Sequence, residues 1–118
     1  MRLTNQLAGT ALVLPVLLLL LSLAAPALAG GNATAQAQVE IRDFKFIPRE
    51  ITIKAGTTVR WTNNEKRQYH SVWFEQAGDP EAPYFFPGES VERTFDKPGV
   101  YPYRCGPHPE MTGVITVE

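Results

Sequence analysis

The sequence contains one cysteine and only two histidines in 118 residues. Small exported domains usually carry cysteines in pairs that form disulfides, so Cys105 excludes a disulfide framework within the chain. An unpaired thiol in an oxidising compartment is damaged unless it is buried, joined to another chain or bound to a metal. The isolated cysteine therefore needs one of these three protections.

The sequence also lacks an excess of charge of either sign, with 11 basic and 12 acidic residues. It contains no basic stretch interleaved with aromatic residues, the pattern typical of a nucleic-acid-binding surface. Helical periodicity of apolar residues is absent as well. We therefore expect no nucleic-acid partner and no long amphipathic helix.

The longest apolar run lies at the N-terminus. Arg2 supplies a positive charge, a leucine-rich uncharged run follows, and residues 27–29 supply the small residues of a cleavage site. This pattern predicts a signal peptide over residues 1–29, cleaved after Ala29, and a periplasmic or otherwise exported protein. The alternative is an uncleaved anchor, because the run approaches the roughly 20 residues that span a bilayer. The prolines in the run favour cleavage, which would leave no stable membrane insertion.

The rest of the chain is long enough for one small domain. Residues 30–36 are small and polar and predict a flexible lead-in, and residues 37–118 predict the domain itself. Short runs rich in β-branched and aromatic residues alternate there with turn residues, which indicates an all-β sandwich of about seven or eight strands. The predicted strands are residues 37–46, 50–54, 57–63, 70–74, 89–95, 100–105 and 113–118.

For some residues in this pattern we make specific predictions. Arg93 shares a strand face with apolar residues and Pro102 cannot donate to a ladder, so we expect a sheet edge or a bulge near each. The charged run at residues 63–67 predicts a solvated turn. Large aromatic residues at alternating positions predict core positions; they are Phe44, Phe46, Trp61, Trp73 and Phe95.

The strongest chemical signal is the segment from Tyr101 to Met111, which places Cys105, His108 and Met111 at the end of a strand and in the short loop after it. Soft sulfur ligands suit copper(I) and imidazole suits copper(II), so two histidines, a cysteine and a weak axial methionine serve both oxidation states. The only histidine left to complete the set is His70. In a sandwich, loops at one end lie close together, so His70 can reach the Cys105 loop.

Each of these residues by itself has an ordinary structural explanation. An isolated cysteine or methionine is usually part of the core, and an isolated histidine usually lies at the surface or is a hydrogen-bonded core residue. Their joint spacing is what predicts a metal site that holds one type 1 copper ion through His70, Cys105, His108 and Met111.

With these residues the chain resembles the small bacterial cupredoxins, most closely the amicyanins and plastocyanin-like proteins. The likeness is carried by Cys105-x-x-His108-x-x-Met111, by the strand leading to Cys105, by the closing strand at 113–117 and by His70 upstream. The resemblance implies a Greek-key β-sandwich that contains a blue copper site, with Met111 as the axial ligand. It also implies a monomeric carrier that shuttles single electrons between larger redox proteins, such as a dehydrogenase and a c-type cytochrome.

The chain departs from the family pattern beside two of the ligands. Family members usually carry asparagine where this chain has Ser71, and often serine or threonine where it has Gly106; those side chains tie the ligand loops together. We expect the Ser71 N–H to remain available to the sulfur, whereas Gly106 has no side chain to offer in return. Pro107 also lacks an N–H that would otherwise donate to the sulfur.

Two other functions compete with electron transfer. A copper storage or delivery protein usually favours one oxidation state through methionine-rich or paired-cysteine sites, unlike the mixed set here. A copper nitrite reductase or multicopper oxidase needs further histidines for a catalytic copper, and none remain once His70 and His108 are used. We therefore expect a carrier and not an enzyme, docking through an apolar surface formed by Pro107, Pro109 and residues 85–87 around His108.

Overall fold

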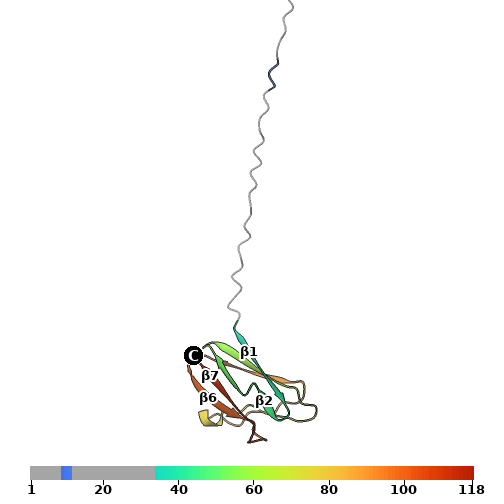
Figure 1. Ribbon diagram of the computed structural model, residues 1–118, viewed down its shortest axis with the longest axis vertical. Coiled ribbons are helices and arrows are strands. Elements are labelled where there is room, and N and C mark those ends of the chain that lie inside the picture. The colour runs from blue at the N-terminus through green and yellow to red at the C-terminus, as the bar shows by residue number, and fades with distance from the viewer. Residues whose placement is uncertain (1–8, 12–33) are drawn as a thin grey trace, which may run out of the picture. The chain divides into compact units, whose positions relative to one another are not determined.

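Seven strands in two sheets make up the domain in the computed structural model, which describes residues 9–11 and 34–118 (Figure 1). The strands are β1 (Gln36–Arg42), β2 (Lys45–Ile47), β3 (Glu50–Ile53), β4 (Thr57–Asn63), β5 (Ser90–Phe95), β6 (Gly99–Arg104) and β7 (Thr112–Val117). A single 3₁₀ turn, η1 (Glu75–Ala77), lies in the long connection between β4 and β5. The all-β sandwich predicted from the alternating runs is confirmed.

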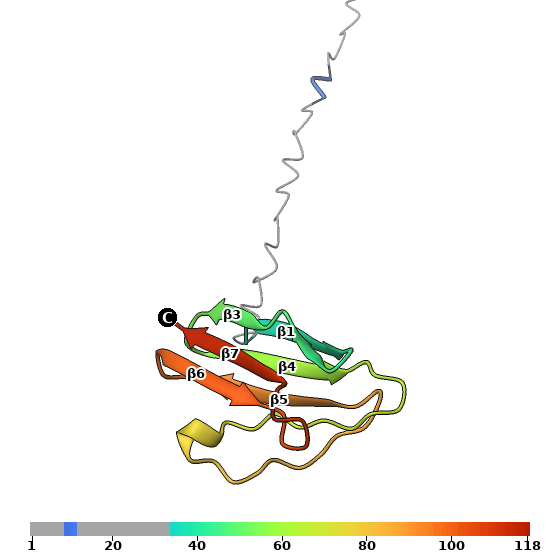
Figure 2. The same ribbon diagram turned by 60° about the horizontal axis from the view of Figure 1, so that its bottom comes forward.

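The strand order explains how distant segments meet. One sheet has the order β2-β1-β4-β5 and the other β3-β7-β6, and Figure 2 shows the second sheet lying in front of the first. The pairs β1–β4 and β3–β7 are parallel, and the other neighbours are antiparallel. Because β5 and β6 are edge strands, the edges expected near Arg93 and Pro102 are confirmed.

The predicted strand at residues 37–46 is in fact two strands joined by a tight turn. Asp43 and Phe44 have φ angles of 52° and 56°, as in the type I′ turn that suits the twist of a hairpin. Phenylalanine is unusual there, and its N–H donates to the Glu65 carboxylate over 2.7 Å, which holds the turn. Phe44 is 46% exposed, so its assignment to the core was wrong.

The predicted strand at residues 70–74 is also wrong. His70 bridges to Phe85 at one end of this segment, and Trp73 bridges to Arg104 at the other. The segment thus pairs with a different neighbour at each end and forms no continuous ladder. This position brings His70 beside the end of β6.

The core lies between the two sheets. Trp61 of β4 donates its indole N–H to the Tyr103 hydroxyl of β6 over 3.2 Å, which links the sheets. Burial raises the pKa of Tyr103 to about 12, so its hydroxyl keeps its proton. Phe46, Trp61 and Phe95 are buried as expected, whereas Trp73 is half-buried. The core extends without a break to Cys105 and Met111.

Residues 1–8 and 12–29 of the predicted signal peptide, which spans 1–29, and residues 30–33 of the lead-in at 30–36 fall outside the described residues. Within residues 9–11 and 34–118, no helix combines the length and apolar character needed to cross a membrane.

Candidate metal centre

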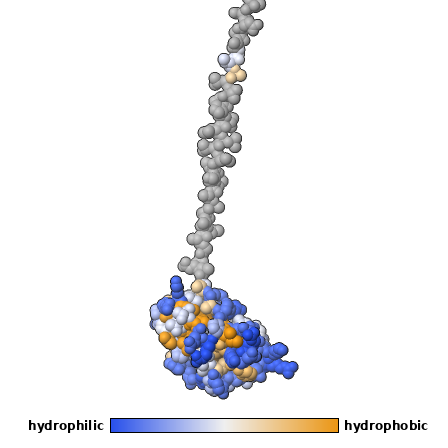
Figure 3. Space-filling view, in the orientation of Figure 1, coloured by the Kyte–Doolittle hydropathy of each residue, from blue (hydrophilic) through white to orange (hydrophobic). Residues whose placement is uncertain are grey.

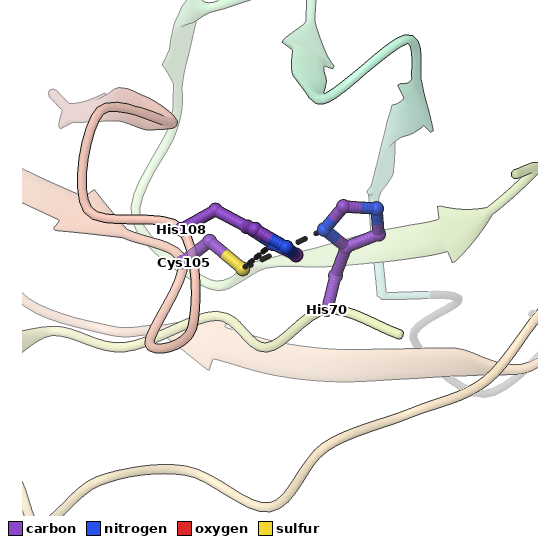
Figure 4. Close-up of side chains that lie close together, drawn as sticks. All are labelled: His70, Cys105 and His108. Carbon is purple, nitrogen blue, oxygen red and sulfur yellow. Dashed lines mark hydrogen bonds between the residues drawn. The ribbon is translucent and has the colours of Figure 1, made fainter. Parts of the chain in front are cut away.

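Three of the four predicted ligands converge at one end of the sandwich. The Cys105 sulfur lies 3.6 Å from Nδ1 of His70 and 3.5 Å from Nδ1 of His108. All three donor atoms lie within 4.8 Å of one another, and Figure 4 shows both imidazoles directed toward the sulfur. His70 comes from the connection after β4, Cys105 follows β6 directly, and His108 lies in the loop before β7.

The loop between β6 and β7 is closed by its own backbone. Cys105 N–H donates to the Met111 carbonyl over 2.9 Å, and Met111 N–H donates to the His108 carbonyl over 3.0 Å. Met111 is 4% exposed and packs in the same core cluster as Cys105. The loop therefore brings Met111 next to the cysteine at its other end, with the methionine side chain in the core.

The sulfur of Cys105 is fully buried and has a backbone donor. Ser71 N–H points at it over 3.3 Å, as expected from the sequence. Burial raises the pKa of the Cys105 thiol, and the Ser71 hydrogen bond opposes this effect. The free thiol is therefore protonated at neutral pH, and a metal that binds it releases a proton.

The two ligand loops remain tied although both usual tethering side chains are changed. The Ser71 hydroxyl accepts a hydrogen bond from Gly106 N–H over 2.8 Å. Gly106 thus contributes its backbone N–H to the tie, although it has no side chain to offer. A Cβ at position 106 would lie 2.6 Å from Glu81 Oε1 and 2.9 Å from Ser71 Oγ, so a larger residue here would require these side chains to shift.

Glu65 is a site residue that sequence reasoning missed. Its carboxylate lies 3.3 Å from Nε2 of His70 and accepts Phe44 N–H, and its side chain is only 11% exposed. With Nε2–H directed at Glu65, Nδ1 of His70 is free to face the sulfur. The prediction of a solvated turn at residues 63–67 was thus wrong for Glu65, and also for Asn63, which is fully buried. No local sequence signal distinguishes Glu65 from an ordinary surface charge.

The environment of His70 predicts how the metal-free protein responds to pH. Burial lowers the pKa of His70, and the hydrogen bond that His70 donates to Glu65 only partly offsets this effect. An unfolded histidine titrates near pH 6.5, so below that value the unfolded chain binds a proton that the folded chain refuses. The free energy of unfolding should therefore fall as the pH drops from 7 toward the lower pKa of the folded state.

Urea unfolding of the metal-free protein at pH 7 and pH 5 measures this dependence. His70→Gln should remove most of the difference between the two pH values because it removes the titrating group. An equal pH dependence in wild type and His70→Gln would show that another group is responsible.

Aromatic residues surround the partly exposed ring of His108. The Phe44 ring lies 4.9 Å from it edge to face, and Tyr69 lies 6.4 Å away and stacks on Tyr84. Phe86 is 55% exposed, whereas Phe85 is buried, so only part of the apolar segment expected at residues 85–87 reaches the surface. In Figure 3, hydrophobic residues interrupt the hydrophilic surface of the domain in several places.

The distances from the sulfur to the two imidazole nitrogens fit one small metal ion. Two atoms bound to a single ion through bonds of about 2.0–2.3 Å lie less than about 4.6 Å apart, and the sulfur lies well within that limit from each nitrogen. Two imidazoles with one thiolate and a nearby methionine form the ligand class typical of blue-copper sites.

Comparison with known proteins agrees with this chemistry. The sequence profile of the copper-binding proteins of the plastocyanin/azurin family matches residues 33–118. Amicyanin-alpha of Methylorubrum extorquens is 39% identical over 85 residues, which cover 69% of this chain and 71% of the relative. Plastocyanin of Scenedesmus fuscus is 39% identical over 84 residues, covering 62% and 86%.

Amicyanin of Paracoccus versutus is similar in both sequence and structure. Its sequence is 40% identical over 86 residues, which cover 68% of this chain and 63% of the relative. Its crystal structure superimposes with a TM-score of 0.63 at 33% identity, covering 73% of this chain and 83% of the other.

Proposed function

Because the chain belongs to the plastocyanin/azurin family of copper-binding proteins, we propose that His70, Cys105, His108 and Met111 hold its copper and that it shuttles single electrons between larger redox proteins. The family and the cluster of two imidazoles with one thiol establish a single type 1 copper site. The observation that carries the proposal is the convergence of three donor atoms within 4.8 Å, two of them from a loop that ends at a buried methionine. Copper bound there supplies a one-electron Cu(I)/Cu(II) couple.

The protein's own contribution is to hold the ligands in place. His70 and Cys105 are both fully buried, which keeps water from the inner side of the site. Hydrogen bonds from Ser71 to the sulfur and from His70 to Glu65 orient these two ligands before any metal binds. Ligands that are already in position need little rearrangement when an electron arrives or leaves, and this lowers the barrier to transfer.

The direction of electron entry and exit follows from burial. His108 is the ligand whose ring is partly exposed, and exposed aromatic side chains lie beside it. We place the docking surface for the electron donor and acceptor there, since transient redox contacts are small and use such apolar areas. The pattern of residues 1–29 supports cleavage after Ala29 and a periplasmic location, with a lead-in at 30–36 and the copper domain at 37–118. The likeness to the small cupredoxins supports a monomer.

Storage or delivery of copper without electron transfer is the alternative to be tested. A delivery site must release its metal in one oxidation state, whereas a carrier must keep it in both. The mixed donor set and the loop closed by its own backbone hydrogen bonds favour a carrier. The same inventory of two histidines argues against an enzyme with a second, catalytic copper.

Repeated reduction and reoxidation of the copper-loaded protein in the presence of a copper(I) chelator tests the proposal. We expect the visible absorbance to disappear and return in each cycle, with about one copper per chain retained at the end. A sample kept oxidised with the same chelator is the control. Transfer of most of the copper to the chelator after reduction would favour delivery over electron transfer.

A further inference from the structure

Arg104 is the last residue of β6 and directly precedes Cys105. Its Nη1 group donates to two carbonyl oxygens of the ligand loop, that of Cys105 over 3.0 Å and that of Gly106 over 3.1 Å. Its Nε–H donates to Glu75 in η1 over 2.6 Å. The planar guanidinium group thus contacts the loop through one nitrogen while another anchors it to a different part of the fold.

The arginine side chain is itself held in one position. The guanidinium carbon lies 4.4 Å from the centre of the Trp73 ring, within the range of a cation–π contact. The backbones of Trp73 and Arg104 exchange two hydrogen bonds of 2.8 and 3.0 Å. The side chain is 23% exposed. Because the arginine is fixed by the ring, by Glu75 and by its own strand, it can hold the loop in place.

The loop needs such support at Gly106. Glycine has more backbone conformations to lose than any other residue, and a larger side chain there would require Ser71 and Glu81 to shift. The Gly106 N–H is held by the Ser71 hydroxyl and its carbonyl by Arg104, so both polar groups of its backbone are bound. One partner is distant in the sequence and the other is near: Ser71 precedes Gly106 by 35 residues and Arg104 precedes it by two.

We propose that Arg104 is a positioning residue that clamps the first two residues of the copper-ligand loop and thereby keeps Cys105 and His108 in register. The inference rests on the proposed function, since it concerns the same site. The clamp depends on the geometry of the guanidinium group, which satisfies two carbonyls and a carboxylate at once. A lysine would keep the positive charge beside the sulfur but could not reproduce this fork.

Amide hydrogen exchange of the metal-free protein, followed by NMR, tests the clamp without copper. In Arg104→Met and in Arg104→Lys, Gly106 N–H and Cys105 N–H should exchange about tenfold faster than in wild type, since hydrogen bonds from a charged donor are lost. Amides of the central strand β4, such as Trp61 N–H, should change much less. Glu75→Gln, which leaves the guanidinium in place, should give a smaller effect in the same direction.

The matched control is Arg60→Met, because Arg60 also lies in a strand and pairs with a carboxylate, Glu92 at 3.1 Å, away from the ligand loop. In Arg60→Met, the amides of the ligand loop should exchange as in wild type. Unchanged loop exchange in Arg104→Met would overturn the clamp, as would equal acceleration of all amides, which indicates general destabilisation. If the loop amides of Arg104→Lys exchange as slowly as in wild type, the positive charge and not the guanidinium geometry holds the loop. If Arg104→Met does not fold, Arg104→Lys and Glu75→Gln still decide between these outcomes.

Copper-loaded samples separate failure of the clamp from failure of the proposed function. The electron paramagnetic resonance spectrum of Arg104→Lys should show a changed copper hyperfine splitting, because the ligand loop is less well held. A wild type that takes up copper without a blue-copper spectrum would refute the proposed function and leave the exchange experiment valid. A wild type with the blue-copper spectrum and a variant spectrum identical to it would refute the clamp alone.

Discussion

Replacing Cys105 by serine is expected to abolish the visible absorbance of the copper(II)-loaded protein while leaving the sandwich folded. The colour of a blue-copper site arises from charge transfer between the cysteine thiolate and copper, and an alkoxyl or hydroxyl ligand does not provide it. Serine differs from cysteine by one atom and fits the same buried position. Visible spectroscopy measures the loss, and far-ultraviolet circular dichroism checks the fold.

Ser71→Ala is the control for this experiment. It removes the hydroxyl that binds Gly106 but keeps the backbone N–H that points at the sulfur, so the blue absorbance should remain. A blue Cys105→Ser protein would disprove the assignment of the sulfur ligand. A colourless wild type fully loaded with copper(II) would disprove the type 1 site as proposed here.

Among alanine substitutions at the glycines that the structure describes, Gly113→Ala is expected to cause the largest loss of stability. Gly113 lies in β7 directly opposite Tyr103, and a Cβ at this position would overlap the tyrosine ring. The ring cannot easily move, because it packs 4.7 Å from Phe46 and its hydroxyl accepts the Trp61 hydrogen bond. We expect the free energy of unfolding of the metal-free protein to fall by about 3 kcal/mol, the upper end for overpacked cores.

Urea unfolding measures this loss, and Gly88→Ala is the matched control. Gly88 has a φ of +86°, and no atom lies within 4 Å of the position of its Cβ. Alanine there meets only backbone strain, worth about 1 kcal/mol. If both variants lose the same amount of stability, steric overlap with Tyr103 is not the cause. A double variant with Tyr103→Leu should recover part of the loss caused by Gly113→Ala, since the overlapping ring is gone.

The sandwich and the choice of ligand residues could be predicted from the sequence because both depend on short-range patterns. Alternation along a strand reports which face is buried, and the predicted strands at residues 50–54, 57–63, 89–95, 100–105 and 113–118 agree with β3 to β7 within a residue or two. Cys105, His108 and Met111 lie in one short loop, so the covalent chain itself keeps them close. His70 was added because the chain has no other histidine left.

The expectations that failed concern segments whose conformation depends on contacts with distant residues. Residues 70–74 have the composition of a strand but bridge to two different neighbours. Phe44 lies two residues before the buried Phe46, as on one face of a strand, yet the hairpin turn places it at the surface. The periodicity of a segment cannot reveal either outcome, because it carries no information about which other segments pair with it in the folded protein.

The sequence by itself thus determined an all-β domain, the metal-binding character of its last loop and the residues able to serve as ligands. Only the tertiary structure decided that Glu65 orients His70, that Ser71 and Gly106 tie the ligand loops through a backbone N–H, and that Arg104 reaches back to the Cys105 and Gly106 carbonyls. The physical reason is that the ability of a residue to bind a metal depends on its own side chain, which the sequence specifies directly. The hydrogen bonds that orient ligands depend on distances of a few ångströms between segments that the chain brings together only when it folds.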